Sequence, residues 1–271
     1  MSKPTAVLFC PGRGSYGKDE LGFVGRTVRS GPVAEALATC DRARRGEGRP
    51  TLSAVDGADR YRPSLHVDGE NAADLIYFGA LAHAEQLRER YDVLAVGGNS
   101  LGWYTALAAS GALDPTSGWR LVATMSSLQK QVKGGQLLTT TVDDDWRPNA
   151  RLAVAVSAVV QALQDRGDDY GCDFSIRLGG HEVLAGTESA LREMLTHLPK
   201  VAIGGRDFPF RLAGHGPFHT ELCRPVAEQA TEMLQDLPVR MPECHLIDGV
   251  GDARSPGPAG PRALLRSTVP A

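Results

Sequence analysis

The sequence predicts an α/β fold in which a main sheet is interrupted by a smaller ferredoxin-like unit. Short apolar runs near the start of the chain and at 93–96 each end in a glycine-rich turn, as strands of an α/β sheet do. The second of these turns leads directly into a helical pattern. From about residue 134, short strand-like runs alternate with helical stretches in an order typical of a ferredoxin-like unit.

The first half of the chain contains the strand, turn and helix on which the functional interpretation depends. A strand is predicted at 6–10 and stops at the turn-forming residues 11–17. Residues 71–90 have apolar side chains at helical spacing and end in a charged stretch, which predicts a helix. The strand at 93–96 runs into the turn GGNSLG, and a further helix is predicted at 104–109.

The second half contains the elements of the smaller unit. We predict strands at 137–142, 173–178 and 182–185, and helices at 152–166 and 188–198. This arrangement of strands and helices predicts a ferredoxin-like fold.

The main sheet is then expected to resume with a strand at 208–213, followed by a helix over 220–237. Proline and glycine are frequent from residue 252 onward, as in an unpacked segment. We therefore expect a large α/β core formed by residues 1–133 and 206–251, a ferredoxin-like subdomain over 134–205, and a flexible tail over 252–271.

The composition is that of a globular protein without a bias toward nucleic acid or membrane. The 271 residues are 42% hydrophobic and 23% charged, and the formal net charge of -3 offers no general attraction to polyanions. No run of about 18 apolar residues indicates a membrane span, and the first residues lack a secretory pattern. The five scattered cysteines include no C-x-x-C pair and favour reduced thiols. We expect a cytoplasmic protein with no nucleic-acid, membrane or metal partner.

Ser100 is the candidate nucleophile. It is the central residue of Gly98-Asn99-Ser100-Leu101-Gly102, a G-x-S-x-G pattern between a predicted strand and a predicted helix. This is the context of a nucleophile elbow, in which glycines permit a strained turn that exposes the serine hydroxyl. The alternative is a serine that only caps the following helix.

His219 is the candidate base. A serine hydroxyl needs a base within hydrogen-bonding reach, most often histidine. His219 is favoured among the seven histidines because it lies at a predicted junction between a strand and a helix, and His215 is the second candidate. A structural or surface histidine is the alternative for either residue.

Residues 12–17, GRGSYG, match the G-x-G-x-x-G pattern of dinucleotide-binding proteins. That interpretation also requires a second strand that ends in an acidic residue about 20 positions further on. Residues 32–45 instead have the pattern of a helix, which disfavours nicotinamide binding. The same loop could present backbone N–H groups to an oxyanion.

Three segments share their order and spacing with a known family. They are FCPGRGSYG near the start, GGNSLGWYTALAASGAL around Ser100, and GPFHTELCRPV around His219. Together with FSIRLGGHEVLAG between the last two, they resemble the malonyl-CoA:acyl carrier protein transacylases and related polyketide-synthase acyltransferase domains. The resemblance covers about residues 5–251.

The resemblance implies a hydrolase-like parallel-sheet core with an inserted ferredoxin-like subdomain. It implies that Ser100 and His219 form a dyad with an acyl-serine intermediate, and that the backbone N–H groups of Arg13 and Leu101 form the oxyanion hole. Acyl-CoA and a phosphopantetheinyl acyl carrier protein would be the substrates, with no bound cofactor.

Four positions differ from the residues usual in the family. Arg13 replaces Gln, Asn99 replaces His, Trp103 replaces Glu, and Thr124 replaces an arginine that pairs with the malonyl carboxylate in malonyl-specific members. The resemblance places Asn99, Trp103 and Thr124 in the substrate-binding site. A buried carboxylate without its partner costs about 3–5 kcal/mol. Thr124 therefore favours a neutral acyl group, unless Arg13 replaces the missing arginine.

The function expected from the resemblance is acyl transfer from acyl-CoA to an acyl carrier protein, in fatty acid or polyketide biosynthesis. Two alternatives remain open. The same acyl-serine would give a thioester hydrolase if water took the acyl group. The departures at Arg13 and Asn99 also allow a weakened, non-catalytic binding protein.

Overall fold

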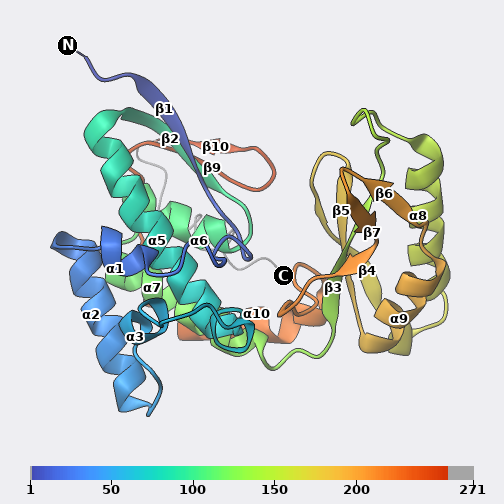
Figure 1. Cartoon of the computed structure of the whole chain (residues 1–271), viewed down its shortest axis with the longest axis horizontal. Coiled ribbons are helices and arrows are strands. Elements are labelled where there is room, and N and C mark those ends of the chain that lie inside the picture. The colour runs from blue at the N-terminus through green and yellow to red at the C-terminus, as the bar shows by residue number, and fades with distance from the viewer. Residues whose placement is uncertain (1, 256–271) are drawn as a thin grey trace. The chain divides into compact units, whose positions relative to one another are not determined.

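The structure, a computed structural model, describes residues 2–255 and divides into two compact units (Figure 1). The first unit contains residues 2–127 and 233–255, and the second contains residues 128–232. The second unit is thus inserted in the sequence of the first.

A four-stranded sheet forms the centre of the first unit. Its strands are β1 (Thr5–Cys10), β2 (Asp92–Gly98), β9 (His245–Ile247) and β10 (Ala253–Arg254), in the order β1-β2-β9-β10. β1, β2 and β9 are parallel, and β10 is antiparallel to β9. The predicted α/β fold with a parallel-sheet core is confirmed.

The start of the predicted tail needs correction. Ala253 and Arg254 form β10 because a turn between Asp248 and Asp252 returns the chain along the outer edge of β9. The Asp248 backbone N–H donates to the Asp252 carbonyl at 3.0 Å in this turn. The remainder of the predicted tail, residues 256–271, lies outside the described residues.

Helix α5 (Gly69–Arg90) is the central helix of the first unit. The Asp68 side chain caps it by accepting hydrogen bonds from the backbone N–H groups of Glu70 and Asn71. Every residue from 72 to 79 is buried, as in a helix with neighbours on all sides. The other helices of this unit are α1 (Phe23–Thr27), α2 (Gly31–Gly46), α3 (Leu52–Asp56), α4 (Pro63–His66), α6 (Leu101–Ala109) and α7 (Pro115–Gln129), whose last two residues belong to the second unit.

Helix α6 connects this helical layer to the sheet. It packs against β1, β2 and α5. All nine of its residues are buried. Ser100, the residue before α6, is therefore held between the end of the parallel strand β2 and a helix that is fixed by several neighbouring elements.

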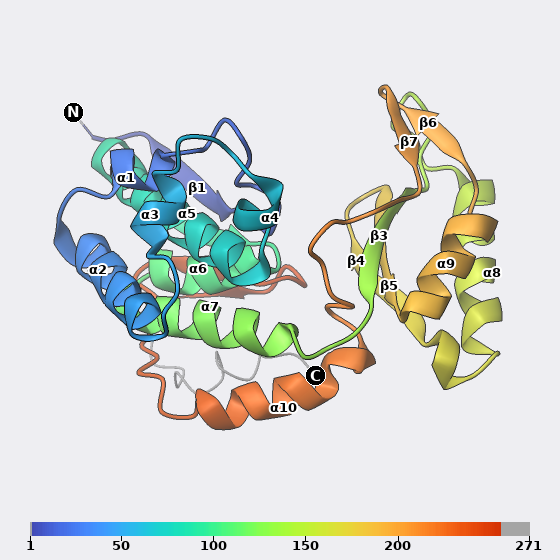
Figure 2. The same cartoon turned by 60° about the horizontal axis from the view of Figure 1, so that its bottom comes forward.

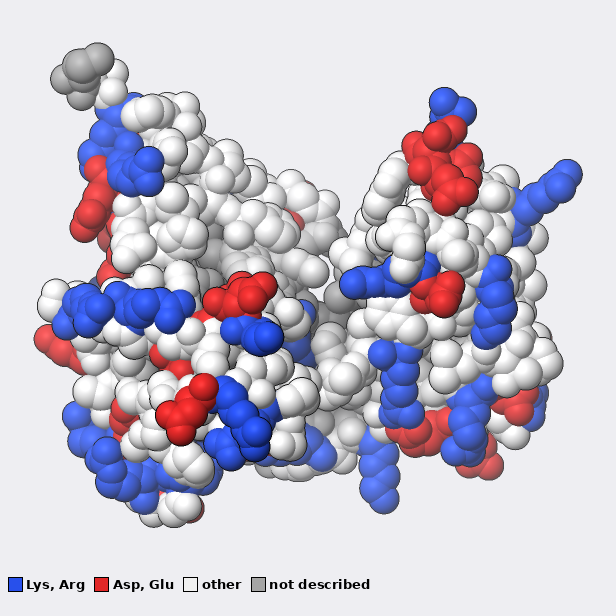
Figure 3. All heavy atoms as spheres, viewed as in Figure 1, with Lys and Arg blue, Asp and Glu red and all other residues white. Residues whose placement is uncertain are grey.

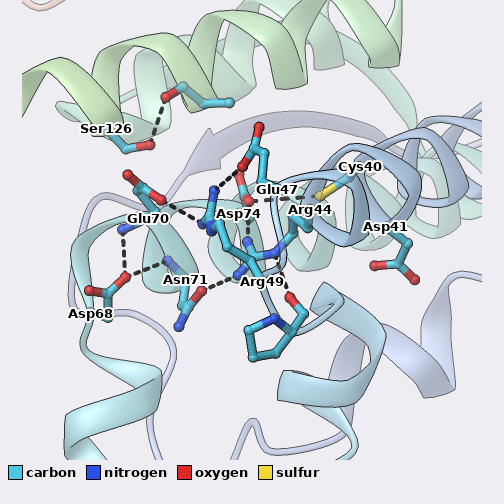
Figure 4. Close-up of polar contacts among 12 residues, drawn as sticks. Cys40, Asp41, Arg44, Glu47, Arg49, Asp68, Glu70, Asn71, Asp74 and Ser126 are labelled. Atoms are coloured by element: carbon cyan, nitrogen blue, oxygen red, sulfur yellow. Dashed lines mark hydrogen bonds and ion pairs between the residues drawn. The ribbon is translucent and has the colours of Figure 1, made fainter.

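A buried ionic cluster joins α2 to α5 (Figure 4). The Arg44 side chain is 2% exposed and its Nη1 lies 2.5 Å from Asp74 Oδ2. Arg44 also donates to Asn71 Oδ1 and to the Pro50 carbonyl, and Cys40 Sγ donates to Asp74 Oδ2 at 3.7 Å. Burial raises the pKa of the Asp74 carboxyl to about 6, against the opposite effect of Arg44. Asp74 is thus the buried acidic partner of Arg44.

The second unit has the β-α-β-β-α-β order of a ferredoxin-like fold. Its strands are antiparallel and follow one another across the sheet in the order β4-β5-β3-β8. Figure 2 shows α8 and α9 side by side on one face of this sheet. The elements are β3 (Gly135–Thr140), α8 (Ala150–Gln164), β4 (Cys172–Arg177), β5 (His181–Gly186), α9 (Glu188–His197) and β8 (Phe210–Arg211).

The core of the second unit lies between these helices and the sheet. Leu137 and Leu184 from the sheet pack with Val156 of α8 and with Leu191 and Met194 of α9. The remaining elements of this unit are η1 (Asp168–Tyr170), β6 (Val201–Ile203), β7 (Arg206–Phe208), η2 (Glu221–Cys223) and α10 (Arg224–Met233), whose last residue belongs to the first unit.

The boundary after residue 205 differs from the predicted one. The single strand expected at 208–213 is two short strands separated by Pro209, which has no N–H to donate to a ladder. β7 pairs with β6, and β8 pairs with β3. Phe208 packs with Val142 and Ile203 of the second unit. These residues therefore do not resume the main sheet, and the second unit continues to residue 232.

The surface has no preference for one sign of charge on the face shown in Figure 3, where basic and acidic side chains are interspersed on both units. This agrees with the small net charge of the sequence. Within residues 2–255, no helix combines the length and the hydropathy that a membrane span requires.

Candidate active site

Ser100 stands in a strained turn between β2 and α6. Its backbone has φ 54° and ψ -117°, a region that residues other than glycine rarely adopt. It occupies the N-cap position of α6, but its side chain makes no capping hydrogen bond. The helix-cap alternative therefore does not explain this serine, and the backbone has the strain expected of a nucleophile elbow.

The two glycines of G-x-S-x-G are required by close backbone contacts. A Cβ atom on Gly98 would lie 2.1 Å from the Gly102 carbonyl oxygen. A Cβ atom on Gly102 would lie 2.1 Å from the Cys10 carbonyl oxygen. β1, β2 and α6 can meet at this point only if both positions lack a side chain.

Replacing Gly102 by alanine is expected to distort the turn and to destabilise the first unit by about 1–3 kcal/mol, as overpacking does. The added methyl group would clash with backbone atoms, which can move less than side-chain atoms. Gly46→Ala is the matched control, because no atom lies within 4 Å of the added Cβ and the position is helical. Thermal unfolding of both variants tests the expected loss of stability. Equal melting temperatures for the two variants would contradict the steric explanation.

The loop after β1 lies against this turn. A Cβ atom on Gly12 would lie 2.9 Å from the Asn99 carbonyl oxygen, and the Asn99 N–H donates to the Cys10 carbonyl at 3.4 Å. The first unit thus brings Arg13 and its neighbours close to Asn99 and Ser100. Residues 31–46 form α2 instead of a second strand, which agrees with the disfavoured dinucleotide interpretation.

The Arg13 side chain is directed to the first turn of α5. Its Nη1 donates to the Gly69 carbonyl oxygen at 2.9 Å. Burial lowers the pKa of Arg13, and the negative charge of Asp68 opposes this shift. The hydrogen bond to Gly69 thus holds the guanidinium beside the cap of α5.

The other predicted residues of the first unit lie on α6 and α7. Leu101 is the first residue of α6, where backbone N–H groups have no acceptor within the helix and the dipole favours negative charge. Trp103 is 8% exposed on the same helix. Thr124 lies on α7 and is half-buried.

His219 lies in the second unit, in the loop between β8 and η2. Its φ of 59° is again in the left-handed region. Burial lowers the pKa of His219 below its ordinary value of 6.5. The imidazole is therefore largely neutral at pH 7, as a general base must be.

Sequence reasoning missed two residues that bind the loop before His219. Ser175 Oγ on β4 donates to the Phe218 carbonyl oxygen at 2.8 Å, and Gln136 Nε2 on β3 donates to the same oxygen at 3.2 Å. Gln136 could have been identified because it is a polar amide in the otherwise largely apolar strand GQLLTT. A buried amide needs hydrogen-bond partners.

His215, the second candidate base, contacts the side chain of Gln136. Its Nδ1 lies 2.7 Å from Gln136 Oε1. An amide oxygen only accepts, so Nδ1 of His215 carries the proton in this contact. The ring also packs against Phe218, with 6.0 Å between the ring centroids. Through these contacts His215 helps to stabilise the loop that contains His219.

The sequence and the fold were compared with those of known proteins. No family model matches the sequence. The malonyl CoA-acyl carrier protein transacylase of Haemophilus influenzae is 28% identical over 157 residues, which are 56% of this chain and 46% of that protein. The alignment thus spans a little less than half of that relative.

Solved structures of the same class cover almost all of the chain. The malonyl transacylase MCAT of Mycobacterium tuberculosis superposes with a TM-score of 0.74 at 20% identity, over 98% of this chain and 80% of that one. A malonyl-transacylase in complex with a type II PKS acyl-carrier protein gives a TM-score of 0.73 at 18% identity, with coverage of 98% and 80%. The chain therefore has the fold of the malonyl-CoA:acyl carrier protein transacylases and is similar in sequence to one of them, in agreement with the resemblance of its motifs.

Proposed function

We propose that the protein transfers an acyl group from acyl-CoA to the phosphopantetheine thiol of an acyl carrier protein through an acyl-serine at Ser100. The main support is the strained backbone of Ser100 at the junction of β2 and α6, in a fold shared with malonyl-CoA:acyl carrier protein transacylases. Strain of this kind persists only where the surrounding structure holds it, and it is concentrated at functional sites.

The proposed reaction has two symmetrical halves. His219 takes the proton of the Ser100 hydroxyl while Oγ attacks the thioester carbonyl carbon. The carbon–sulfur bond then breaks, and His219 returns the proton to the CoA thiolate. In the second half the carrier thiol attacks the acyl-serine, His219 accepts the thiol proton, and the proton finally returns to Ser100 Oγ as the acyl thioester leaves.

The backbone N–H groups of Leu101 and Arg13 are the proposed oxyanion donors. Leu101 is suited to this role because it begins α6, where the helix N-terminus favours negative charge. Arg13 is suited because its loop packs against Asn99. The Arg13 side chain is occupied at Gly69, so only its main chain is assigned to the reaction.

We further propose that the acyl group is uncharged. Thr124 offers no positive charge to a malonyl carboxylate, and the Arg13 guanidinium contacts the Gly69 carbonyl and lies near the negative charge of Asp68. An unpaired buried carboxylate would weaken binding by about 10²–10³-fold. Asn99 and Trp103 complete the proposed substrate-binding residues.

Intact-protein mass spectrometry after incubation with acetyl-, propionyl- and malonyl-CoA tests the proposal. A single acyl adduct is expected from an uncharged donor, and Ser100→Ala should abolish it. Addition of holo-carrier protein should remove the adduct and acylate the carrier. An adduct that persists in Ser100→Ala, or release of free acid in place of carrier acylation, would contradict the proposed transfer.

The same panel with Arg13→Ala tests the acyl group. Because this change leaves the backbone N–H in place, loading with acetyl or propionyl groups should be largely retained. If malonyl loading were efficient and unaffected by Arg13→Ala, neither a neutral acyl group nor a carboxylate bound by Arg13 could be correct.

A further inference from the structure

The backbone of His219 needs support that its own residue type does not provide. A residue other than glycine with φ near +59° is strained by about 1–3 kcal/mol. The peptide group that precedes it is formed by the Phe218 carbonyl and the His219 N–H. The orientation of this planar group fixes one side of the φ rotation of His219. The hydrogen bonds to the Phe218 carbonyl therefore help to determine the direction in which the His219 imidazole projects from the backbone.

Two side chains of the second sheet hold that carbonyl. Ser175 Oγ lies 2.8 Å and Gln136 Nε2 lies 3.2 Å from the Phe218 oxygen. A carbonyl oxygen can accept two hydrogen bonds, and this one accepts from both side chains. Ser175 lies at an irregularity of β4 and Gln136 lies on β3, two strands separated by β5 in the same sheet, and neither residue belongs to the loop itself.

The donors are themselves oriented by a closed network. Gln136 Nε2 also donates to Ser175 Oγ at 2.6 Å. Gln136 Oε1 accepts from His215 Nδ1 at 2.7 Å. The Gln136 side chain is 2% exposed, and every one of its polar groups has a partner. The amide has one orientation consistent with all these contacts.

We propose that Gln136 and Ser175 are positioning residues that hold His219 in its strained conformation for proton transfer. This inference rests on the proposed function, in which His219 is the base. The loop has a separate anchor on its other side, where Thr220 Oγ1 donates to the Pro217 carbonyl at 2.7 Å. Loss of the Ser175 and Gln136 contacts should therefore free the peptide group before His219 without unfolding the loop.

Ser175→Ala and Ser175→Thr form the matched pair for the test. The alanine variant removes the hydroxyl, whereas threonine retains it and is well tolerated on a strand. In steady-state acyl transfer, we expect Ser175→Ala to lower kcat by about 10–100-fold with little change in KM, since a displacement of about 1 Å can cost that much. The kcat of Ser175→Thr should remain within about threefold of the wild-type value. Equal kcat values for alanine and threonine would overturn the proposal.

A second readout does not depend on activity. The Cα and imidazole Cε1 resonances of His219 in NMR spectra report its backbone conformation and ring environment. We expect them to shift in Ser175→Ala and in Gln136→Leu but to stay near their wild-type positions in Ser175→Thr. Unchanged His219 resonances in Ser175→Ala would overturn the positioning role even if no acyl-CoA were a substrate. If Ser100 is not acylated but these resonances shift as expected, the proposed function fails and the positioning role stands.

Discussion

His219→Ala is expected to lower the rate of acyl-serine formation by about 10²–10⁴-fold, the usual contribution of a general base. The Ser100 hydroxyl is a weak nucleophile and would lose the group that accepts its proton. Rapid-quench kinetics with an acyl-CoA donor measure this step directly. His197→Ala is the control, because His197 is an exposed residue that contacts Glu193 on α9. Similar rates for the two variants would remove His219 from the mechanism.

The pH dependence of the same reaction follows from the environment of His219. Burial disfavours the charged imidazolium and lowers the pKa below the ordinary 6.5. The neutral base is therefore present above this lowered pKa and is lost as the pH falls through it. We expect the acid limb of kcat/KM to have its midpoint below pH 6.5. A midpoint above this value would require another group to be the base.

Asp74→Ala is expected to reduce the free energy of unfolding of the first unit by about 3–5 kcal/mol. The substitution leaves the Arg44 guanidinium, which is 2% exposed, without its carboxylate partner. The remaining acceptors, the Asn71 side chain and the Pro50 carbonyl, are neutral and do not balance the charge. Denaturant titration followed by circular dichroism measures the effect.

A double substitution separates this explanation from simple loss of packing. Replacing both partners, as in Arg44→Met with Asp74→Leu, should restore much of the stability that Asp74→Ala loses, because no buried charge then remains unpaired. Arg224→Ala is the surface control: its ion pair with Glu221 is exposed and should contribute little. Equal losses in the double variant and in Asp74→Ala would show that burial of the charge is not the cause.

The elbow at Ser100 could be predicted from the sequence because all its requirements are local. The strand, the two glycines and the helix lie within a few residues, and each has its own sequence signal. The structure adds the reason for Gly102, whose neighbour is the carbonyl of Cys10 on another strand. Such a contact between segments distant in sequence has no signal in the G-x-S-x-G pattern.

Long-range contacts explain what the sequence did not reveal. Gln136 and Ser175 are separated from Phe218 by 82 and 43 positions, so neither could be associated with His219 by spacing. The strands around Pro209 are only two and three residues long. Strands this short, with sequences RDF and FR, have too few residues for a pattern that would assign them to either sheet. The pairing of β8 with β3 was decided by packing in the second unit.

Arg44 illustrates the same limit for charged residues. It lies on α2 among other arginines, a pattern that normally predicts a solvent-exposed face. It is buried because Asp74, 30 positions away, provides the opposite charge inside the helical layer. An ionic partner at that sequence separation can be identified only when the packing of α2 against α5 is known.

The insertion of residues 128–232 into the first unit has a consequence for biosynthesis. β2 acquires its second neighbour only when residues 245–247 form β9 beside it. On the ribosome these residues emerge after the entire inserted unit has been made, whereas all strands of that unit are by then available. During translation the inserted unit is therefore the first that can fold completely, and the parallel sheet with the turn at Ser100 closes last.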